Sequence, residues 1–243
     1  MENLTALVKI TQHPKETSSM TVSIPQKIRL VREKIRDVCA QDTENADLRL
    51  FIDQRLPQLH YAISATRAQI SLHDFILRYI AQIPEFIEII YKIALDNDFL
   101  ADIELLITIA TDYFLSPPSA IQESQTLLGL LDEAYLAHRL LEEINDRLMV
   151  QIGAPLLPMD STTANLIVHD IIGEPFANEL DAVALFASDT VFNNATLSSS
   201  DAMRNFAQQN AAIGWENVLA RWPSLAENLG LTLSFASTRG GLQ

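Results

Sequence analysis

Apolar residues recur along most of this chain at the spacing of an α-helix. The first clear series is Ile28, Val31, Ile35 and Val38, three and four residues apart. This spacing places the four side chains on one face of a helix. Pro25 lies just before them and suits a first helical turn, where a backbone N–H has no intrahelical partner. The pattern therefore predicts an amphipathic helix that begins near Pro25.

The same period predicts further helices, separated by short polar breaks. Pro57 and Pro84 interrupt two of the apolar series, and we expect a kink or a division at each, because proline inside a helix removes a hydrogen bond. Residues 187–200 are rich in Ser, Asn and Thr, which is typical of a loop. The expected helices cover residues 46–63, 71–83, 86–95, 99–115, 125–150, 162–172, 176–186, 201–210, 215–222 and 224–229.

The chain has only 7 glycines in 243 residues. Large sheet folds use more glycine in their turns, so the low number favours helices joined by short loops. We expect an all-α fold, a multi-helix bundle of about eight to ten helices. A mobile N-terminal arm is expected at residues 1–24, and short strands at 4–10 and 232–236 would be a minor element.

A segment with Gly153, Pro155 and Pro158 separates two helical parts of the chain. Glycine and proline together are typical of a break between helices. We expect a helical domain at residues 25–152 and a C-terminal helical region at residues 160–243. The C-terminal region either stands alone or packs onto the first part as one domain.

The formal net charge is −14, which disfavours non-specific binding to nucleic acid or to an anionic membrane. The charge is uneven, because residues 1–36 hold seven Lys or Arg against three Asp or Glu, about +4. Either a solvated helix face or a contact with the chain's own acidic body explains this basic segment. The alternative is a basic arm that binds a polyanion.

A single cysteine, Cys39, excludes a disulfide within one chain and fits a reducing compartment. The N-terminal residues lack the apolar core of a secretory signal. The longest apolar stretch, residues 103–115, is shorter than the roughly 20 residues that cross a bilayer. We therefore expect a cytoplasmic protein.

One predicted helix holds the densest group of residues that could carry chemistry. His138, Glu142 and Asp146 are four residues apart and share one helix face. With Asp132 and Glu133 they could hold a divalent cation if a neighbouring helix supplied more ligands. The alternative is a core-facing stripe with the acidic residues as a solvated flank. The stripe would consist of Leu130, Leu131, Ala134, Ala137, His138, Leu141 and Ile144.

A second polar cluster surrounds the adjacent pair His169 and Asp170. A His-Asp pair is typical of metal-dependent phosphohydrolases, which need further His and Asp ligands from neighbouring helices. Asn165 lies one helical turn before His169, and Glu174 follows the pair. The alternative is a buried histidine whose hydrogen bonds are satisfied by its neighbours.

Two short motifs in the middle of the chain support a family resemblance. Residues 113–117 end one predicted helix with Tyr-Phe-Leu-Ser-Pro, and residues 129–133 open the next with Gly-Leu-Leu-Asp-Glu. Ile121 and Glu123 lie between them. On these motifs, residues from about 92 to 148 resemble the YkvA-like family of bacterial helical domains, a domain of unknown function (DUF1232).

The resemblance implies a helical hairpin and gives no activity. The family's acidic positions fall on Glu123, Asp132 and Glu133, whereas Ser119 and Gln122 stand where the family usually has Asp and Pro. In such a hairpin the carboxylates would gather at its mouth, close to helix N-termini that favour negative charge.

The sequence as a whole favours a non-enzymatic bacterial helical protein that binds a protein partner or forms a homo-oligomer. This interpretation needs no cofactor and no nucleic acid. One alternative is peripheral membrane association through basic residues 27–36, with the apolar face of that helix inserted. The other alternative is a metal-dependent hydrolase with a divalent metal held by Glu123, Asp132, Glu133, His138 and Glu142.

Overall fold

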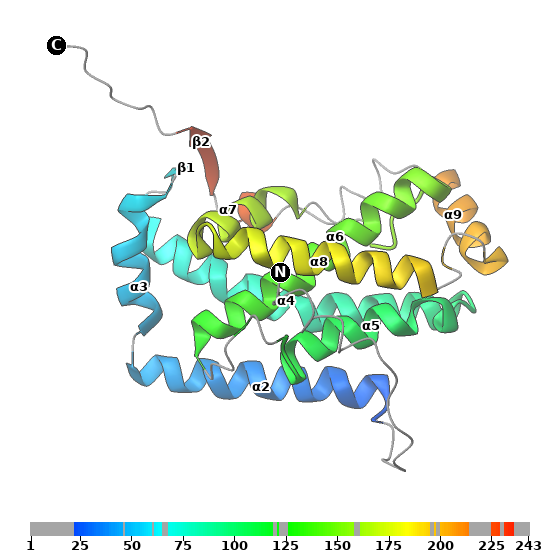
Figure 1. Cartoon of the computed structure of the whole chain (residues 1–243), viewed down its shortest axis with the longest axis horizontal. Coiled ribbons are helices and arrows are strands. Elements are labelled where there is room, and N and C mark those ends of the chain that lie inside the picture. The colour runs from blue at the N-terminus through cyan, green and yellow to red at the C-terminus, as the bar shows by residue number, and fades with distance from the viewer. Residues whose placement is uncertain are drawn as a thin grey trace.

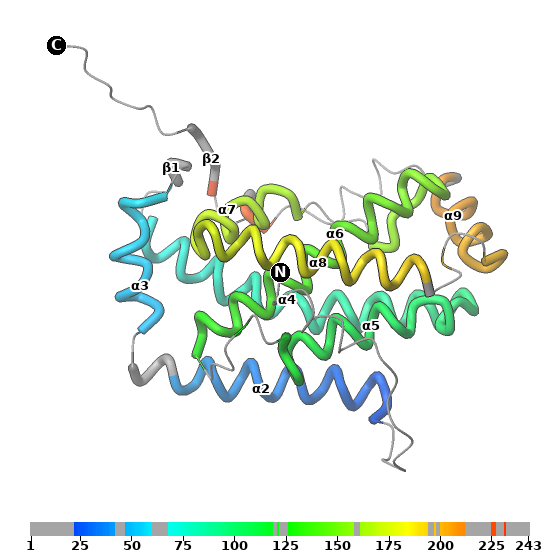
Figure 2. Tube along the Cα trace, in the orientation of Figure 1, coloured from blue at the N-terminus to red at the C-terminus, as the bar shows by residue number. Residues whose placement is uncertain are grey.

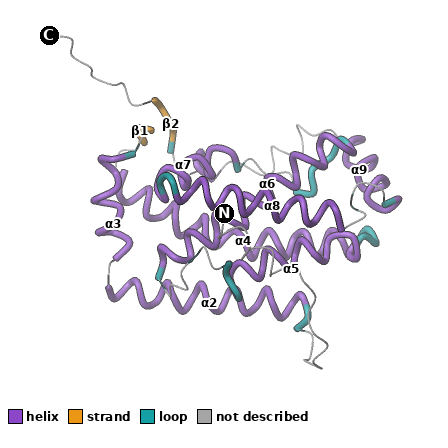
Figure 3. The backbone as a smooth tube through the Cα atoms, in the orientation of Figure 1, coloured by secondary structure: helices purple, strands orange, loops and turns teal. Residues whose placement is uncertain are grey.

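The protein is an all-α helical bundle, as the sequence predicts, and nearly every element drawn in Figure 1 and Figure 3 is a helix. The computed structural model describes residues 22–45, 47–59, 61–64, 68–118, 121, 126–157, 161–194, 197, 200–213, 225–228 and 231–235. The helices are α2 (Ile24–Asn45), α3 (Asp47–Arg55), α4 (Ala68–Asp96), α5 (Leu100–Leu115), α6 (Leu127–Ile152), α7 (Thr162–Ile172), α8 (Phe176–Asn194), α9 (Asp201–Ile213) and α11 (Leu225–Asn228).

A short antiparallel pair of strands accompanies the helices. A 3-10 turn, η2 (Leu56–Gln58), leads from α3 to β1 (Tyr61–Ser64), and β1 pairs with β2 (Thr232–Phe235). The register places Ile63 opposite Leu233. This pairing confirms the strand predicted near residues 232–236 and ties the C-terminal region to the segment that follows α3.

The apolar core is continuous among helices from both halves of the chain. α4, α5 and α6 pack against one another, α2 packs against α4 and α5, and α8 packs along α6. Figure 2 traces α2 along one long edge of the bundle. One cluster of buried apolar residues includes members of α2, α4, α5, α6, α7, α8 and α11. Its largest side chains include Tyr79, Tyr135, Phe75, Phe99 and Phe114.

Helix α4 is continuous from Ala68 to Asp96 and contains Pro84, so the division predicted at that proline is wrong. Ile80, Ile83 and Ile87, on both sides of the proline, are fully buried. Burying an isoleucine side chain stabilises the fold by about 1.5–3 kcal/mol, so several such residues outweigh the hydrogen bond that Pro84 removes.

Two other predicted boundaries are also wrong. The helix expected over residues 46–63 is divided at Pro57, as predicted, but no helix resumes after this proline among the described residues of that range. Helix α3 ends at Arg55, and Pro57 lies in the 3-10 turn that leads into strand β1. Helix α8 continues to Asn194 and takes up part of the loop predicted at residues 187–200. Val191 on this extension is buried, so its apolar contacts stabilise helix where the local composition favours a loop.

Several predictions concern residues outside the described ranges. They are most of the arm predicted at residues 1–24, the strand at residues 4–10, the helix at residues 215–222 and the acidic candidate Glu123.

Basic residues of α2 contact the acidic body of the same chain. The Lys27 ammonium lies 2.9 Å from a carboxylate oxygen of Asp112, and the Lys34 ammonium lies 2.7 Å from one of Glu133. These ion pairs join α2 to α5 and α6. They agree with the interpretation that the basic segment meets the chain's own negative charge.

The apolar face of α2 belongs to the core, because Ile28, Val31 and Ile35 are buried. Peripheral membrane association through this helix would need the same face in contact with lipid. The described conformation therefore does not present the face on which the membrane hypothesis depends. Among the described helices, none combines the length and the hydropathy that crossing a bilayer requires.

Arg55 stabilises the C-terminal end of α7. Its Nη2 donates to the carbonyl of Asp170 at 2.9 Å and its Nε donates to the carbonyl of Ile171 at 3.0 Å. These carbonyls belong to the last turn, where the helix offers no N–H partner. Gly173 follows with a φ of 87°, and a Cβ on it would lie 2.2 Å from Arg55 Nη2. Glycine is needed here both for its conformation and for the close approach of Arg55.

We expect Gly173→Ala to lower the free energy of unfolding by about 2 kcal/mol, because the methyl group strains the positive φ and displaces Arg55 from two carbonyls. Urea unfolding followed by circular dichroism measures the loss. Gly153→Ala is the matched control, since Gly153 also has positive φ (72°) but a Cβ there would meet nothing within 4 Å. An equal loss in the two variants would contradict the role given to the Arg55 contact.

Candidate functional site

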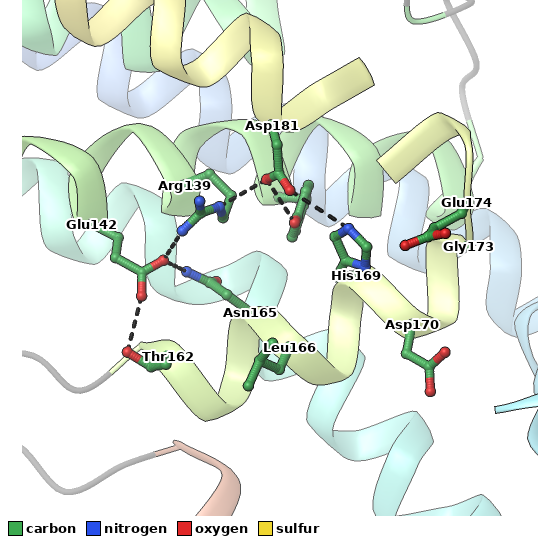
Figure 4. Close-up of a pocket in the computed structure, with 11 residues that line it drawn as sticks. Arg139, Glu142, Thr162, Asn165, Leu166, His169, Asp170, Gly173, Glu174 and Asp181 are labelled. Carbon is green, nitrogen blue, oxygen red and sulfur yellow. Dashed lines mark hydrogen bonds and ion pairs between the residues drawn. The ribbon is translucent and has the colours of Figure 1, made fainter. Parts of the chain in front are cut away.

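An open cavity of about 370 Å³ lies between α6, α7 and α8. Figure 4 shows charged and polar side chains from these helices directed toward one another around it. Its volume is at the lower end of the range that ligand pockets occupy. A cavity of the same volume lies between α3 and α4. The cavity between α6, α7 and α8 is the stronger candidate in the described part of the chain, because hydrogen bonds between these helices hold its charged walls together.

Helical spacing brings the walls of the cavity together. On α7, Thr162, Asn165 and His169 line the cavity from successive turns of one face, and Gly173 ends that face. The opposite face of α7, which includes Ile167, is buried in the core. The core contacts of α7 thus fix the direction of its polar face.

Helix α6 supplies the second wall in the same way, through Tyr135, Arg139 and Glu142. Asp181 of α8 completes the walls. Because α8 packs along α6, positions that are far apart in sequence become neighbours here. Leu166 of α7 also lines the cavity, and its side chain is exposed.

Arg139 joins two acidic residues across the cavity. Its Nε donates to Asp181 Oδ1 at 2.8 Å, and its Nη1 pairs with Glu142. Burial lowers the pKa of the guanidinium, but the hydrogen bond to Asp181 and the charge of Glu142 more than offset this and raise it. Arg139 is therefore a fixed cation between two fixed carboxylates.

Glu142 also accepts hydrogen bonds from α7. Asn165 Nδ2 donates to Glu142 Oε2 at 2.6 Å, and the Thr162 hydroxyl donates to Oε1 at 3.0 Å. The Asn165 side chain in turn accepts a 2.7 Å hydrogen bond from the buried Tyr79 hydroxyl of α4. This chain of contacts connects the cavity to the core and holds its inner wall in place.

Asp181 is the second centre of the network. Besides Arg139, it accepts a 2.8 Å hydrogen bond from the Tyr135 hydroxyl. Burial, followed by the charge of Asp181, raises the pKa of Tyr135, so this hydroxyl stays protonated and donates. His169 Nε2 lies 3.5 Å from Asp181 Oδ2 and 3.1 Å from the side-chain oxygen of Asn178.

The cavity carries an excess of negative charge. Among the described residues that line it, Glu142, Asp170, Glu174 and Asp181 carry carboxylates and Arg139 carries a guanidinium. Asp170 is buried and already interacts within the chain. Figure 4 shows Arg139 and Glu142 at one end, and Asp170 and Glu174 at the other. Within the described part of the chain, Glu174 makes no side-chain hydrogen bond or ion pair, and it is exposed. Glu174 is therefore the described lining carboxylate that is most open to a ligand.

We expect Arg139→Met to lower the free energy of unfolding by about 2 kcal/mol, because Glu142 and Asp181 lose their shared cation while both remain close to the core. This is less than for a fully buried pair, since Asp181 is 30% exposed. Arg147→Met is the matched control on the same helix. Arg147 pairs with Glu143 and with Asp189, which is 53% exposed. Chemical unfolding of both variants should show the larger loss for Arg139→Met, and the reverse order would contradict the network.

The residues of α6 predicted as metal ligands lie in different environments. Glu133 is buried and bonded to Lys34 of α2, whereas Glu142 faces the cavity. Asp132 is partly buried, and burial raises its pKa to about 7. In the described residues, no group of three or more His, Cys, Asp or Glu side chains converges as a metal site would require. Glu123 lies outside those residues.

His138 belongs to the core, as the stripe interpretation expects. Its ring stacks on Tyr79 with centroids 3.9 Å apart and meets Phe86 edge-on at 5.7 Å. Its Nε2 donates to the Tyr79 carbonyl at 2.9 Å, which leaves Nδ1 as a buried atom without a hydrogen-bond partner. All the apolar members of the predicted stripe are buried with it.

The predicted solvated flank is only partly correct. Asp146 is exposed, but the carboxylates of Glu133 and Glu142 are buried and engaged in ion pairs. The N-terminus of α6 is capped by Thr126 and not by the carboxylates predicted near it. The Thr126 side chain accepts a 3.2 Å hydrogen bond from Gly129 N. Glu133 lies beyond the first turn, where the helix dipole has little effect.

The adjacent pair His169 and Asp170 does not present one ligand set. Figure 4 shows His169 directed toward Asp181, while the Asp170 side chain points away from it. Both line the same cavity as Asn165, so the sequence identified one wall of the site by its helical spacing. It did not identify Arg139 or Asp181, whose contact joins residues 42 positions apart.

Comparisons of the chain with protein-family models, with curated proteins and with solved structures found no match. The resemblance to the YkvA-like family therefore stays a prediction. Any function assigned to the chain depends on the geometry of the cavity.

Proposed function

We propose that this protein acts without catalysis, by binding a partner protein, and that the cavity between α6, α7 and α8 receives part of that partner. The observation that carries this proposal is the cavity itself, an open space of about 370 Å³ with an excess of carboxylates. A side chain of a partner fits such a volume, and the charge of the cavity favours a side chain of opposite charge.

The internal contacts of the walls support binding over chemistry. Glu142 accepts from Asn165 and Thr162 and pairs with Arg139, and Asp181 accepts from Tyr135 and Arg139. These groups stabilise one another in fixed positions, as the walls of a preorganised binding site do. A general acid or base would instead need to exchange a proton with a substrate.

The exposed Leu166 supports a protein as the ligand. Its side chain is 42% exposed at the edge of a charged cavity. An apolar contact next to a polar pocket is the usual arrangement of a protein interface, where apolar anchors exclude water from nearby charges. A second copy of the chain is one form that the partner could take.

A photo-crosslinking residue at position 166 tests the proposal, with the same residue at the exposed Val150 as control. We expect one defined protein, or a second copy of the chain, to be crosslinked from position 166 and not from position 150. The captured protein is then purified and its affinity for wild type and for Leu166→Ser is measured, with a loss of about tenfold expected. A strictly monomeric protein with no crosslink specific to position 166 would contradict the proposal.

A further inference from the structure

We propose that the group received by the cavity is a cation, the ammonium or guanidinium of a lysine or arginine side chain on the partner protein. This inference rests on the proposed function and specifies its ligand. It depends on the distribution of charge within the cavity and on which carboxylates already have hydrogen bonds or ion pairs within the protein.

At the inner end of the cavity, the charged side chains of the protein already pair with one another. Arg139 lies between Glu142 and Asp181 and pairs with both, so its positive charge is committed. An anionic ligand would have to approach this guanidinium past two carboxylates, and would meet like charge at short range. The geometry of Arg139 thus disfavours the anion that a lone arginine in a cavity would attract.

The outer end of the cavity offers negative charge to a ligand. Glu174 is exposed in the turn after α7, lines the cavity, and has no side-chain partner among the described residues. Asp170 lines the same end, but it is buried and already interacts within the chain, so Glu174 is the carboxylate that a ligand meets there. A cation placed here would gain charge-assisted hydrogen bonds without displacing Arg139 from its own contacts.

The rest of the lining suits a side chain that carries its charge on an apolar stem. Leu166 is exposed beside the carboxylates and would contact the methylene groups of a lysine or arginine. A small inorganic cation would make no use of this apolar surface. The described residues also provide no group of three or more ligands of the kind that a metal ion needs.

Calorimetric titration with short peptides tests the cation. The probes are acetyl-Leu-Lys-Leu-amide and the same peptide with norleucine, an uncharged residue of similar shape, in place of lysine. We expect the lysine peptide to bind at least about tenfold more tightly, and its affinity to fall as the salt concentration rises. Equal affinity for the two peptides, or tighter binding of a glutamate peptide, would overturn the inference.

Two variants test whether the lysine peptide binds at Glu174. Glu174→Gln removes the exposed carboxylate of the cavity and should weaken the lysine peptide by roughly fivefold. Glu179→Gln removes an exposed carboxylate of α8 that does not line the cavity, and should leave the affinity unchanged. An equal loss in both variants would mean that the net charge of the protein attracts the peptide, and would overturn the inference.

Two outcomes separate this inference from the proposed function. If no protein is crosslinked specifically from position 166, but the lysine peptide binds more tightly than the norleucine peptide and Glu174→Gln weakens it, the cation is correct and the partner protein is contradicted. If a partner is crosslinked from position 166 but the lysine and norleucine peptides bind equally, the proposed function stands and the cation is wrong.

Discussion

Replacing Lys34 by methionine is expected to lower the free energy of unfolding by about 3–5 kcal/mol, because it leaves a buried carboxylate without its cation. The Lys34 ammonium donates to both carboxylate oxygens of Glu133, at 2.7 and 2.8 Å, and to the carbonyl of Phe114 at 2.6 Å. These three bonds use all its protons and join α2 to α5 and α6.

The size of the effect follows from the burial of Glu133, whose side chain is 0% exposed. In Lys34→Met this carboxylate stays in the core without the ammonium that compensates its charge. Lys27→Met is the matched control on the same helix, because its partner Asp112 is 44% exposed and returns to water. We expect a loss of about 1 kcal/mol or less there.

Urea unfolding of the two variants measures the difference. The double variant Lys34→Met/Glu133→Leu should recover most of the stability, because replacing both partners of a buried ion pair by apolar residues is often neutral. Equal losses in Lys34→Met and Lys27→Met would contradict the account, and so would a double variant that is no more stable than Lys34→Met.

Acid is expected to destabilise the protein by about 3 kcal/mol through His138 alone. Burial lowers the pKa of this histidine from 6.5 to about 4, although the hydrogen bond to the Tyr79 carbonyl acts in the opposite direction. The unfolded chain therefore binds a proton near pH 6.5, whereas the folded protein resists protonation until about pH 4. The stability is fully present above pH 6.5 and is lost as the pH falls from about 6.5 to about 4.

His138→Gln isolates this contribution, because glutamine keeps an N–H donor and does not titrate in this range. Unfolding free energies of both proteins are measured at several pH values from about 7 to about 4. Contributions of the carboxylates are common to the two proteins and cancel in the difference. We expect wild type to lose about 3 kcal/mol more than the variant over this range. A difference that does not change with pH would show that His138 titrates normally.

The helical fold could be predicted because its main signal is local. Leu130, Ala134 and Leu141 of α6 are buried as their spacing predicts, and the same holds for Ile28 and Val31 of α2. The errors arise where tertiary contacts outweigh a local rule. Pro84 favours a helix end by itself, but the core contacts on both sides of it keep α4 continuous.

The candidate site was harder to predict, because it depends on pairs that are distant in sequence. Asn165 and His169 could be grouped from their helical spacing, and both line the cavity. The partners of Glu133 and Glu142 were not visible in the sequence, so these residues were predicted to be solvated or to bind metal. Charge alone does not tell which acidic residues the fold will bury, since that depends on the cation brought beside each.

The cavity as the place where a cationic side chain binds is the central claim, and mapping amide chemical shifts by nuclear magnetic resonance tests it most directly. The isotope-labelled protein is titrated with acetyl-Leu-Lys-Leu-amide, and the residues whose signals move are located on the structure. The account predicts that the lysine peptide causes the largest shifts at Leu166, His169, Gly173 and Glu174, and that the norleucine peptide causes only small shifts. Shifts centred on another surface, or shifts of equal size with the norleucine peptide, would contradict it.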